Sequence, residues 1–499
     1  MTTPQPGLLL ILDGWGHAPP APDNAISLAH TPTLDALTEH ATLAEASGDA
    51  VGLLPGTVGN SEIGHLVIGA GRPLPYDSLL VQHAIDDGSL ARDPRLTQLI
   101  SDVAARDGTL HLIGLCSDGQ IHAHVDHLRI LLAAAASAST PPRVAIHAIT
   151  DGRDVADRTA AGYLDRVLAH TGEAGIGTLA TVIGRGYALD KAGRSDLTDQ
   201  AVALVADLQG RRTETPEAAV SGDNGDEWTA PTRFPGAAPI ADGDGLIWFN
   251  FRSDRIQQFA DGLHDHLAAT GRAVSALSLA RYDTRTPITP LVERADASGG
   301  LGDQLRAAGI RSARIAEAEK FEHVTYYLNG RDRAARSIEE HLRITDATPP
   351  DYVARPDMNI DRLTGAILAA TTRADLPLVV ANLPNMDVVG HTGDLEATVA
   401  ACEYTDRAMA TLLKAAQERG RWILAVGDHG NAETMTITSG AARRPYGGHT
   451  TNPVPLAIRT SDGGTPPAAP HATLADVAPT VLRLLDVPPG LTMTGKPLL

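Results

Sequence analysis

Short apolar runs that stop abruptly at charged residues recur along this chain and limit what it can fold into. The first, Gly7 to Leu12, is apolar throughout and ends at Asp13. Such a run is typical of a strand buried on both faces in a parallel sheet, because strands with one wet face alternate apolar and polar residues. Open α/β sheets bind ligands at the carboxyl ends of their strands. The pattern predicts an α/β fold with functional residues at strand ends, although Asp13 alone also fits a simple turn.

Two further series of such runs follow and are expected to form strands. The middle series is Thr109 to Leu115, Arg143 to Ile149, Gly177 to Ile183 and Gly245 to Phe251; the last series is Ser312 to Ala316, Leu376 to Ala381 and Arg421 to Val426. Helical patterns separate several of them, and strand–helix alternation predicts mostly parallel sheets. All four runs of the middle series end in polar or charged residues, which indicates one shared pocket. Residues 286–300, rich in Pro, Thr, Ala and Gly, are expected to be a linker.

The length and the charge of the chain narrow its class. At 499 residues it exceeds one ordinary core, so two or three domains are expected. The formal net charge of −19 disfavours nucleic acid as a partner, because a phosphate backbone requires a basic surface. No apolar run is long enough to span a membrane, and the first residues lack a signal-peptide pattern, so no membrane partner and a cytoplasmic location are expected. The two cysteines, Cys116 and Cys402, agree with a reducing compartment.

One stretch carries a serine at a predicted helix start. In Gly59-Asn-Ser-Glu-Ile-Gly-His65, Ser61 lies where a loop turns into a helical pattern. A serine in this place can cap the helix by accepting a bond from a free backbone N–H group. It can also present its hydroxyl where free N–H groups and the helix dipole attract a phosphate. Spacing alone favours the cap, but acidic and histidine residues at other strand ends could bring metal ions to this serine.

Carboxylates and imidazoles gather at the expected strand ends and in Gly-rich turns. Asp387 and His391 are four residues apart, so on a helix they would share one face. The full set is Asp13, Asp387, His391, Asp428, His429 and His449. Each spacing alone also fits a surface ion pair or a turn, but together they suit Mn²⁺, Zn²⁺ or a related ion. Two such ions beside a serine would suit phosphoryl transfer through a phosphoserine.

Arginines gather at the strand ends of the middle series. They are Arg153, Arg185, Arg252 and Arg255. Arginine forks match phosphate and carboxylate oxygens in bidentate geometry. Any one of these arginines could be an idle surface residue, but four at strand ends predict an anion site. Asp154 could be an ion-pair partner of Arg153 or a general base whose pKa the arginines set.

In these residues the chain resembles the cofactor-independent phosphoglycerate mutases of the alkaline phosphatase superfamily. The match runs in order along essentially the whole chain. It includes Leu12-Asp-Gly-Trp-Gly16, Gly59-Asn-Ser-Glu-Ile-Gly-His-Leu66, Asp151-Gly-Arg-Asp154, Phe249-Asn-Phe-Arg-Ser-Asp-Arg255, Asp387-Val-Val-Gly-His-Thr-Gly393 and Gly427-Asp-His-Gly-Asn431. The metal motifs alone would indicate only the superfamily, and the motifs of the middle series single out the mutases.

The resemblance implies two α/β domains with mostly parallel sheets. An alkaline-phosphatase-like metal-binding domain would comprise residues 1–76 and 298–499, and residues 77–297 would be an inserted phosphotransferase domain that binds the substrate. The implied activity interconverts 3-phosphoglycerate and 2-phosphoglycerate, in glycolysis and gluconeogenesis, without 2,3-bisphosphoglycerate. The resemblance also favours a monomer. It implies two Mn²⁺ ions, or Mg²⁺, Co²⁺ or Zn²⁺ in their place.

The resemblance also implies a role for each site residue. One ion would be held by Asp387, His391 and His449, and the other by Asp13, Ser61, Asp428 and His429. Ser61 would take the phosphoryl group and return it to the second hydroxyl of a glycerate trapped by domain closure, with Asp154 as acid and base. The substrate would be held by His122, Arg153, Asp154, Arg185, Lys191, Arg252, Arg255 and Lys320.

One position departs from the family pattern. The family reads roughly Tyr-Tyr-Ala-Met-Asp-Arg after its Gly-Arg pair, whereas this chain reads Gly186-Tyr-Ala-Leu-Asp-Lys191. Lysine keeps the positive charge but loses the guanidinium fork. Arg194 is therefore an alternative to Lys191 in this role.

Two other functions stay open on sequence alone. The first is a metal-dependent phosphomonoesterase or phosphodiesterase of the same superfamily, which would not need the arginine-rich middle segment. The second is a non-catalytic, metal-dependent binding module, against which the intact Ser61 and the complete set of ligands argue.

Overall fold

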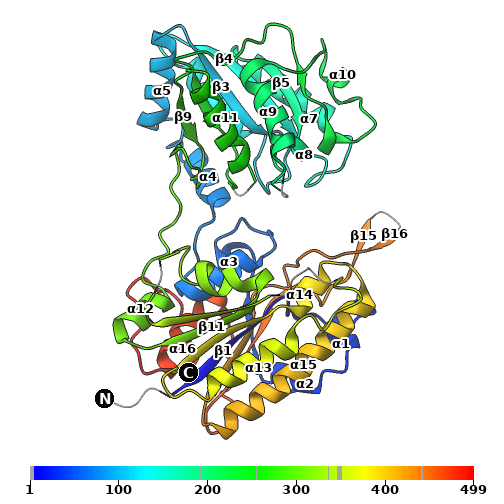
Figure 1. Ribbon diagram of the computed structural model, residues 1–499, viewed down its shortest axis with the longest axis vertical. Coiled ribbons are helices and arrows are strands. Elements are labelled where there is room, and N and C mark those ends of the chain that lie inside the picture. Colours follow the sequence, from blue (N-terminus) through cyan, green and yellow to red (C-terminus); the bar gives the residue numbers. More distant parts are fainter. Residues whose placement is uncertain (1–4, 191–192, 254, 335, 346–350, 440–441) are drawn as a thin grey trace. The chain divides into compact units, whose positions relative to one another are not determined.

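The computed structural model describes residues 5–190, 193–253, 255–334, 336–345, 351–439 and 442–499. Backbone contacts group the chain into two compact units: unit 1 comprises Met1–Pro75 and Asp296–Leu499, and unit 2 comprises Tyr76–Ala295. Each unit is built on an eight-stranded sheet flanked by helices (Figure 1). The predicted fold class, two α/β units with mostly parallel sheets, is confirmed.

The sheet of unit 1 has the strand order β12-β11-β13-β1-β14-β17-β2-β18. The strands are β1 (Gly7–Leu12), β2 (Thr42–Glu45), β11 (Ser312–Glu317), β12 (Glu339–Ile344), β13 (Leu378–Leu383), β14 (Trp422–Gly427), β17 (Val454–Arg459) and β18 (Ala472–Thr473). The five strands from β12 to β14 pair in parallel, and β17 pairs antiparallel with β14 and β2. A separate hairpin is formed by β15 (Thr436–Ser439) and β16 (Ala442–Pro445).

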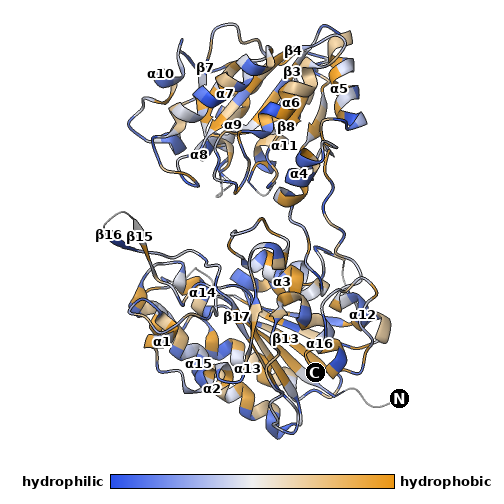
Figure 2. Cartoon of the chain, turned by 180° about the vertical axis from the view of Figure 1, so that it is seen from behind, coloured by the Kyte–Doolittle hydropathy of each residue, from blue (hydrophilic) through white to orange (hydrophobic). Residues whose placement is uncertain are grey.

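Helices cover both faces of this sheet. On one face α13 (Ile360–Thr371) and α2 (Pro32–Thr38) pack against the long α15 (Leu395–Glu418), and on the other α3 (Ser61–Ala70) packs with α12 (Leu301–Ala308) and α16 (Val477–Leu484) (Figures 1 and 2). The remaining helices are the short α1 (Ala25–Leu28) and α14 (Asn385–Gly390). Leu8, Leu10 and Leu12 of β1 are fully buried, and Figure 2 shows β13 and β17 as hydrophobic strands. Burial on both faces explains why these strands read as continuous apolar runs.

The sheet of unit 2 has the strand order β10-β9-β8-β3-β4-β5-β7-β6. The strands are β3 (Thr109–Leu115), β4 (Arg143–Thr150), β5 (Thr178–Gly184), β6 (Arg211–Arg212), β7 (Thr232–Arg233), β8 (Gly245–Trp248), β9 (Ser275–Ser278) and β10 (Thr289–Pro290). All neighbours pair in parallel except β5 and β7. The helices are α4 (Asp77–Asp86), α5 (Pro94–Ala105), α6 (His127–Ala136), α7 (Ala160–Ala174), α8 (Arg185–Ala188), α9 (Ser195–Asp207), α10 (Pro216–Val220) and α11 (Gln257–Ala269). Helices α9 and α11 pack together, as do α6 and α7.

Two sequence predictions in this unit need correction. The strand expected at Gly245 to Phe251 ends at Trp248, because the next residues bond singly to other segments: Phe249 N–H to Ile113 and Phe251 N–H to His122. Part of the expected linker, Thr289–Pro290, is the edge strand β10. Proline is tolerated at a sheet edge, where its missing N–H group breaks no ladder. In the part of the chain that the structure describes, no helix is both long enough and apolar enough to cross a bilayer.

Candidate functional site

The carboxyl ends of four neighbouring strands of unit 1 deliver the first cluster of polar side chains. Asp13 directly follows β1, and Lys320 ends the short helical turn η3 (Ala318–Lys320) after β11. Asp387 lies in the first turn of α14 after β13, and Asp428 follows β14. The register aligns Leu12 with the last residues of both neighbouring strands, so the residues that follow them emerge at the same level.

Ser61 is held in the middle of this cluster. Asn60 is the N-cap of α3 and accepts a hydrogen bond from Ile63 N–H, so the serine itself is free of the capping role. The Ser61 hydroxyl lies 2.7 Å from Lys320 Nζ, 2.9 Å from His429 Nε2 and 3.2 Å from Asp13 Oδ1. Ser61 as a whole is only 7 % exposed to solvent.

A glycine allows helix α3 to come this close to β14. A Cβ atom on Gly64 would lie 2.5 Å from the carbonyl oxygen of Asp428, which no side chain could accommodate without a backbone shift. On the opposite side of the cluster, Gly14 has a left-handed φ of 75° and donates its N–H to Asp428 Oδ1. Both glycines in the quoted motifs therefore serve close backbone approach.

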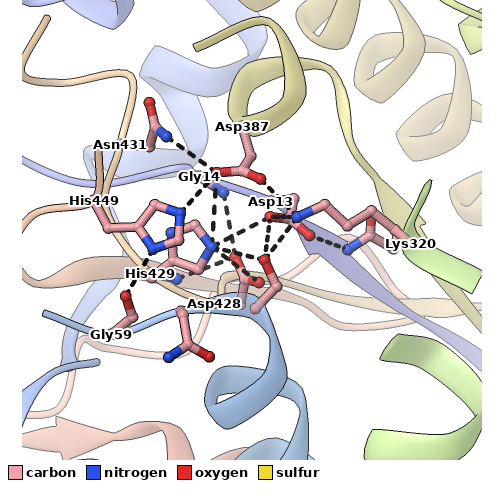
Figure 3. A network of polar contacts seen from close by, with 12 residues as sticks. Asp13, Gly14, Gly59, Lys320, Asp387, Asp428, His429, Asn431 and His449 are labelled. Carbon is pink, nitrogen blue, oxygen red and sulfur yellow. Dashed lines mark hydrogen bonds and ion pairs between the residues drawn. The ribbon is translucent and has the colours of Figure 1, made fainter. Parts of the chain in front are cut away.

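The histidines at the other edge of the cluster converge on Asp387. His391 Nε2 and His449 Nε2 each lie 3.4 Å from Asp387 Oδ1, and the two nitrogens are 3.2 Å apart. The other nitrogen of each ring faces a backbone carbonyl: Gly447 O for His391 and Gly59 O for His449. These bonds leave both Nε2 atoms directed at the carboxylate (Figure 3 shows His449).

Burial and charge act against each other in this cluster. Burial opposes ionisation of Asp13 and Asp387, but Lys320 and the neighbouring histidines together outweigh it and hold the pKa of both carboxyls well below their usual range. Burial also opposes charge on Lys320, yet Asp13 and Asp387 raise its pKa. For His429, Asp428 and Asp387 overcome burial and raise the pKa to about 10.

The residues of this cluster fit divalent metal ions. Donor atoms of Asp387, His391 and His449 lie within 4.8 Å of one another, and so do those of Asp13, Asp387 and His429. Asp428 Oδ2 is buried and accepts no hydrogen bond from the described residues. A buried carboxylate oxygen without a donor is costly unless a cation satisfies it, and mixed carboxylate and imidazole donors suit transition metals.

Unit 2 carries a second cluster at the carboxyl ends of its own strands. Asp151 follows β4 and accepts hydrogen bonds from the Ser117 hydroxyl (2.6 Å) and from the N–H groups of Arg153 and Asp154. Arg185, which begins α8 after β5, donates from Nη1 to Asp151 Oδ1 at 2.6 Å and to Asp154 Oδ2 at 2.5 Å. The aspartates thus fix the guanidinium at the edge of the sheet.

The charges that act on the His122 ring show which other residues belong to this cluster. His122 is buried, and its Nε2 lies 3.9 Å from Asp154 Oδ2. Burial lowers its pKa to about 2, and the charges that add to this effect belong to Arg252, Arg185, Arg255 and Arg153. All four predicted arginines therefore lie within electrostatic range of one ring. Arg252 and Arg255 lie between β8 and α11, which begins at Gln257.

Lys191 and Arg194 are the two candidates for the second basic substrate-binding residue after Arg185. Lys191 lies outside the described residues. Arg194 donates from Nε and Nη2 to Asp190 Oδ1, at 2.9 and 2.6 Å, and its guanidinium lies 5.9 Å from the centre of the Trp228 ring. Its fork is thus engaged by an acidic neighbour.

Some polar residues of the first cluster escaped the sequence predictions. Asn382 donates to Asp13 Oδ2 at 2.6 Å, and Asn431 donates to Asp387 Oδ1 at 3.1 Å. His65, buried on α3, lies 3.3 Å from Asp428 Oδ2. A signal existed for Asn382, because it is a polar residue directly after an apolar run, but nothing in the sequence pairs it with Asp13.

Comparisons with known proteins show which family the chain resembles. The sequence pattern of the metalloenzyme superfamily matches residues 5–489. The chain is similar to the 2,3-bisphosphoglycerate-independent phosphoglycerate mutase of Streptomyces coelicolor, with 63 % identity over 512 residues and 100 % of both chains covered. It is 39 % identical to the enzyme of the same name from a Synechococcus strain, over 99 % of this chain and 96 % of the relative.

A solved structure is similar over the same extent. It is the Leishmania mexicana phosphoglycerate mutase at low cobalt concentration, with a TM-score of 0.79, 27 % identity, and coverage of 99 % of this chain and 97 % of that one. Because the superfamily pattern spans nearly the whole chain and a relative matches it at 63 % identity over its full length, the chain belongs to the family of 2,3-bisphosphoglycerate-independent phosphoglycerate mutases.

Proposed function

We propose that this enzyme interconverts 3-phosphoglycerate and 2-phosphoglycerate through a phosphoryl group carried transiently on Ser61. The observation that supports this most directly is the placement of the Ser61 hydroxyl 2.7 Å from Lys320 Nζ, at the start of a helix whose cap is supplied by Asn60. An ammonium group and free helix N–H groups both favour a phosphate at this oxygen. The serine is buried, which protects an ester formed there from water.

We assign two divalent ions to the first cluster. Asp387, His391 and His449 would hold one, and Asp13, Ser61, Asp428 and His429 the other. When bound, such ions stabilise an ionised serine hydroxyl and neutralise phosphate oxygens. Mn²⁺ is the proposed ion, and Mg²⁺, Co²⁺ and Zn²⁺ are alternatives that metal analysis of the purified enzyme would decide.

The proposed reaction has two transfers that mirror each other. Ser61 Oγ enters the cycle ionised, its proton having passed to solvent. In the first transfer it bonds to phosphorus while the bond from phosphorus to the glycerate oxygen breaks. Asp154 gives a proton to that departing oxygen and later takes one from the second hydroxyl of the glycerate. That hydroxyl then bonds to phosphorus, and Ser61 Oγ leaves. Lys320 stabilises the charge on the serine oxygen in both transfers.

We assign substrate binding in unit 2 to the second cluster. Arg153, Arg185, Arg252 and Arg255 would bind carboxylate and phosphate oxygens, which guanidinium forks match. His122 stays neutral because burial and these arginines depress its pKa, so it would bind as a hydrogen-bond partner and not as a cation. We accordingly propose that unit 1 is the metal-binding phosphatase-like domain and unit 2 the phosphotransferase domain.

A coupled assay tests the proposal. Metal-loaded enzyme receives 3-phosphoglycerate without 2,3-bisphosphoglycerate, and 2-phosphoglycerate is followed through enolase while free phosphate is measured in parallel. Product without free phosphate is expected. Free phosphate without product would instead support the alternative, a metal-dependent phosphomonoesterase. The proposed monomer is checked by light scattering on a sizing column, and the proposed cytoplasmic location by cell fractionation.

A further inference from the structure

His65 contacts three parts of the first cluster at once, although it stands outside the predicted set of ligands. It is fully buried and lies one helical turn after Ser61 on α3. Its Nδ1 is 2.8 Å from the carbonyl oxygen of Ser61 and 3.3 Å from Asp428 Oδ2, and its Nε2 is 3.1 Å from Asn382 Nδ2. The ring therefore lies between the nucleophile's backbone, one carboxylate and one amide.

The bonds of Asn382 determine which nitrogen of the ring carries the proton. Asp13 Oδ2, 2.6 Å from the Asn382 amide, is a carboxylate oxygen and can only accept, so the amide nitrogen faces it. The same nitrogen lies 3.1 Å from His65 Nε2, which must therefore be the acceptor. The proton is then on Nδ1, where the Ser61 carbonyl oxygen accepts it. These hydrogen bonds hold the ring in a single orientation and tautomer.

This tautomer argues against His65 as a metal ligand. Donor atoms of Asp13, His65 and Asp428 do lie within 4.8 Å of one another, a grouping that could hold an ion. Yet Nδ1 has its hydrogen bonded to a carbonyl oxygen, and the lone pair of Nε2 accepts from an amide. Neither nitrogen has a lone pair available for a metal.

The surroundings of the ring restrain it further. His323 lies edge-on to it, with ring centres 5.3 Å apart, and stacks in turn on Tyr327. Both belong to η4 (His323–Tyr327), a π-helical turn that begins three residues after Lys320. Such turns are rare and occur often at functional sites. Helix α3, which carries His65, is restrained as well by the close approach of Gly64 to Asp428.

We propose that His65 is a positioning residue that holds the Ser61 backbone and, through Asn382, the Asp13 carboxylate in the geometry required by the ion on the Ser61 side. Partners that orient metal ligands typically contribute about 10- to 100-fold to metal affinity. The inference rests on the two-ion assignment above. It concerns one ion only, because the polar contacts of His65 lie with Ser61, Asp428 and Asn382, on the Ser61 side of the cluster.

Calorimetric titration with Mn²⁺ tests the inference in the full chain. His391→Ala is made first to weaken the other site, so that one ion is expected to remain with high affinity where the wild type binds two. In that background His65→Leu keeps the volume of the ring but has no polar atom, and we expect the Kd of the remaining ion to rise about 10- to 100-fold. His65→Asn keeps a donor near the position of Nδ1, so part of the lost affinity should return. His264→Ala, which removes a buried histidine of unit 2, is the matched control and should leave the Kd unchanged.

The outcomes separate this inference from the proposed function. An unchanged Kd in His65→Leu, or no recovery in His65→Asn, would overturn the positioning role even if the enzyme binds two ions. A wild type that binds fewer than two ions would instead refute the two-ion assignment. A variant that fails to fold is recognised by its circular dichroism, and Asn382→Leu then supplies the second test, with a rise in Kd expected for the same ion.

Discussion

The two units use the same structural position for opposite kinds of charge. In each, polar residues follow the carboxyl ends of neighbouring parallel strands of an eight-stranded sheet. In unit 1 those residues are chiefly carboxylates and imidazoles gathered around Lys320, which suit cations. In unit 2 they are chiefly arginines fixed by Asp151 and Asp154, which suit anions. The fold thus determines where polar side chains gather, and the chemistry of those side chains determines which class of ligand each cluster suits.

Two buried histidines make the contrast quantitative. His429 in unit 1 has a pKa raised to about 10, and His122 in unit 2 has a pKa lowered to about 2. Burial disfavours the charged form of both rings, so it cannot explain opposite directions. The neighbours do: Asp428 and Asp387 surround one ring, and arginines the other. Each prediction below tests one side of this difference.

The largest effect is expected at the nucleophile of unit 1. Ser61→Ala removes the oxygen that would carry the phosphoryl group, and nucleophile loss in enzymes of this kind costs at least about 10⁴-fold in kcat. The coupled enolase assay measures it. Ser312→Ala is the matched control, since Ser312 is also buried in unit 1 and its hydroxyl makes no hydrogen bond to the described residues. Full isomerase activity in Ser61→Ala would rule out the phosphoserine.

Removal of the metal ions should affect unit 1 and spare unit 2. Dialysis against a chelator is expected to lower kcat by at least about 10³-fold, since metal ions supply several kcal/mol of charge stabilisation in phosphoryl transfer. Added Mn²⁺ should restore it. Hydrogen exchange should rise around Asp13 and Asp428 and stay unchanged in β3 to β5. Full activity of the stripped enzyme, or equal changes in both units, would contradict the assignment of the ions to unit 1.

The sequence predicted the strands well where burial is complete. The runs Gly7–Leu12 and Thr109–Leu115 coincide with β1 and β3, because a strand that is apolar on both faces has no competing pattern. β10 was predicted as linker, because two residues containing a proline have no periodicity to detect. Site residues at strand ends, such as Asp387, could be predicted because they follow an apolar run directly in the sequence.

Contacts between distant segments could not be predicted in the same way. Lys320 bonds to Asp13 across 307 positions, and Asn382 to His65 across 317. Such pairs depend on strand order and on the rotation of each helix, which a single sequence does not encode locally. The resemblance to a family predicted Lys320 as a site residue, whereas the contacts from which we infer a role for His65 are visible only in the folded structure.

An intermediate effect is expected from the buried ion pairs of unit 2. Arg185 is 5 % exposed and bonded to Asp151 and Asp154, so Arg185→Met leaves two carboxylates without their counter-ion and should cost about 3–5 kcal/mol of stability. Arg153→Met, whose side chain is 57 % exposed beside Glu227, should cost no more than about 1 kcal/mol. Hydrogen exchange of β4 and β5 peptides measures both. Equal losses would show that burial does not distinguish the two arginines.

The smallest effect is a pH dependence at His122. Its folded pKa of about 2 lies below the unfolded value of about 6.5, so as pH falls through 6.5 the unfolded chain takes up a proton that the folded chain refuses. Unit 2 should therefore lose roughly 2 kcal/mol from this residue between pH 8 and pH 5. His122→Leu cannot take up that proton, and its stability should fall less over the same interval.

Comparison of the two pH slopes isolates the histidine from any general cost of the substitution. His122→Leu removes a buried side chain, and any stability that this costs at pH 8 is lost equally at every pH. Hydrogen exchange of β3 and β4 peptides at pH 5 and pH 8, corrected for the intrinsic exchange rate, gives the slope for unit 2 alone. Parallel slopes would mean that burial and the neighbouring arginines do not keep His122 uncharged, and the two clusters would then differ only in which residues they contain.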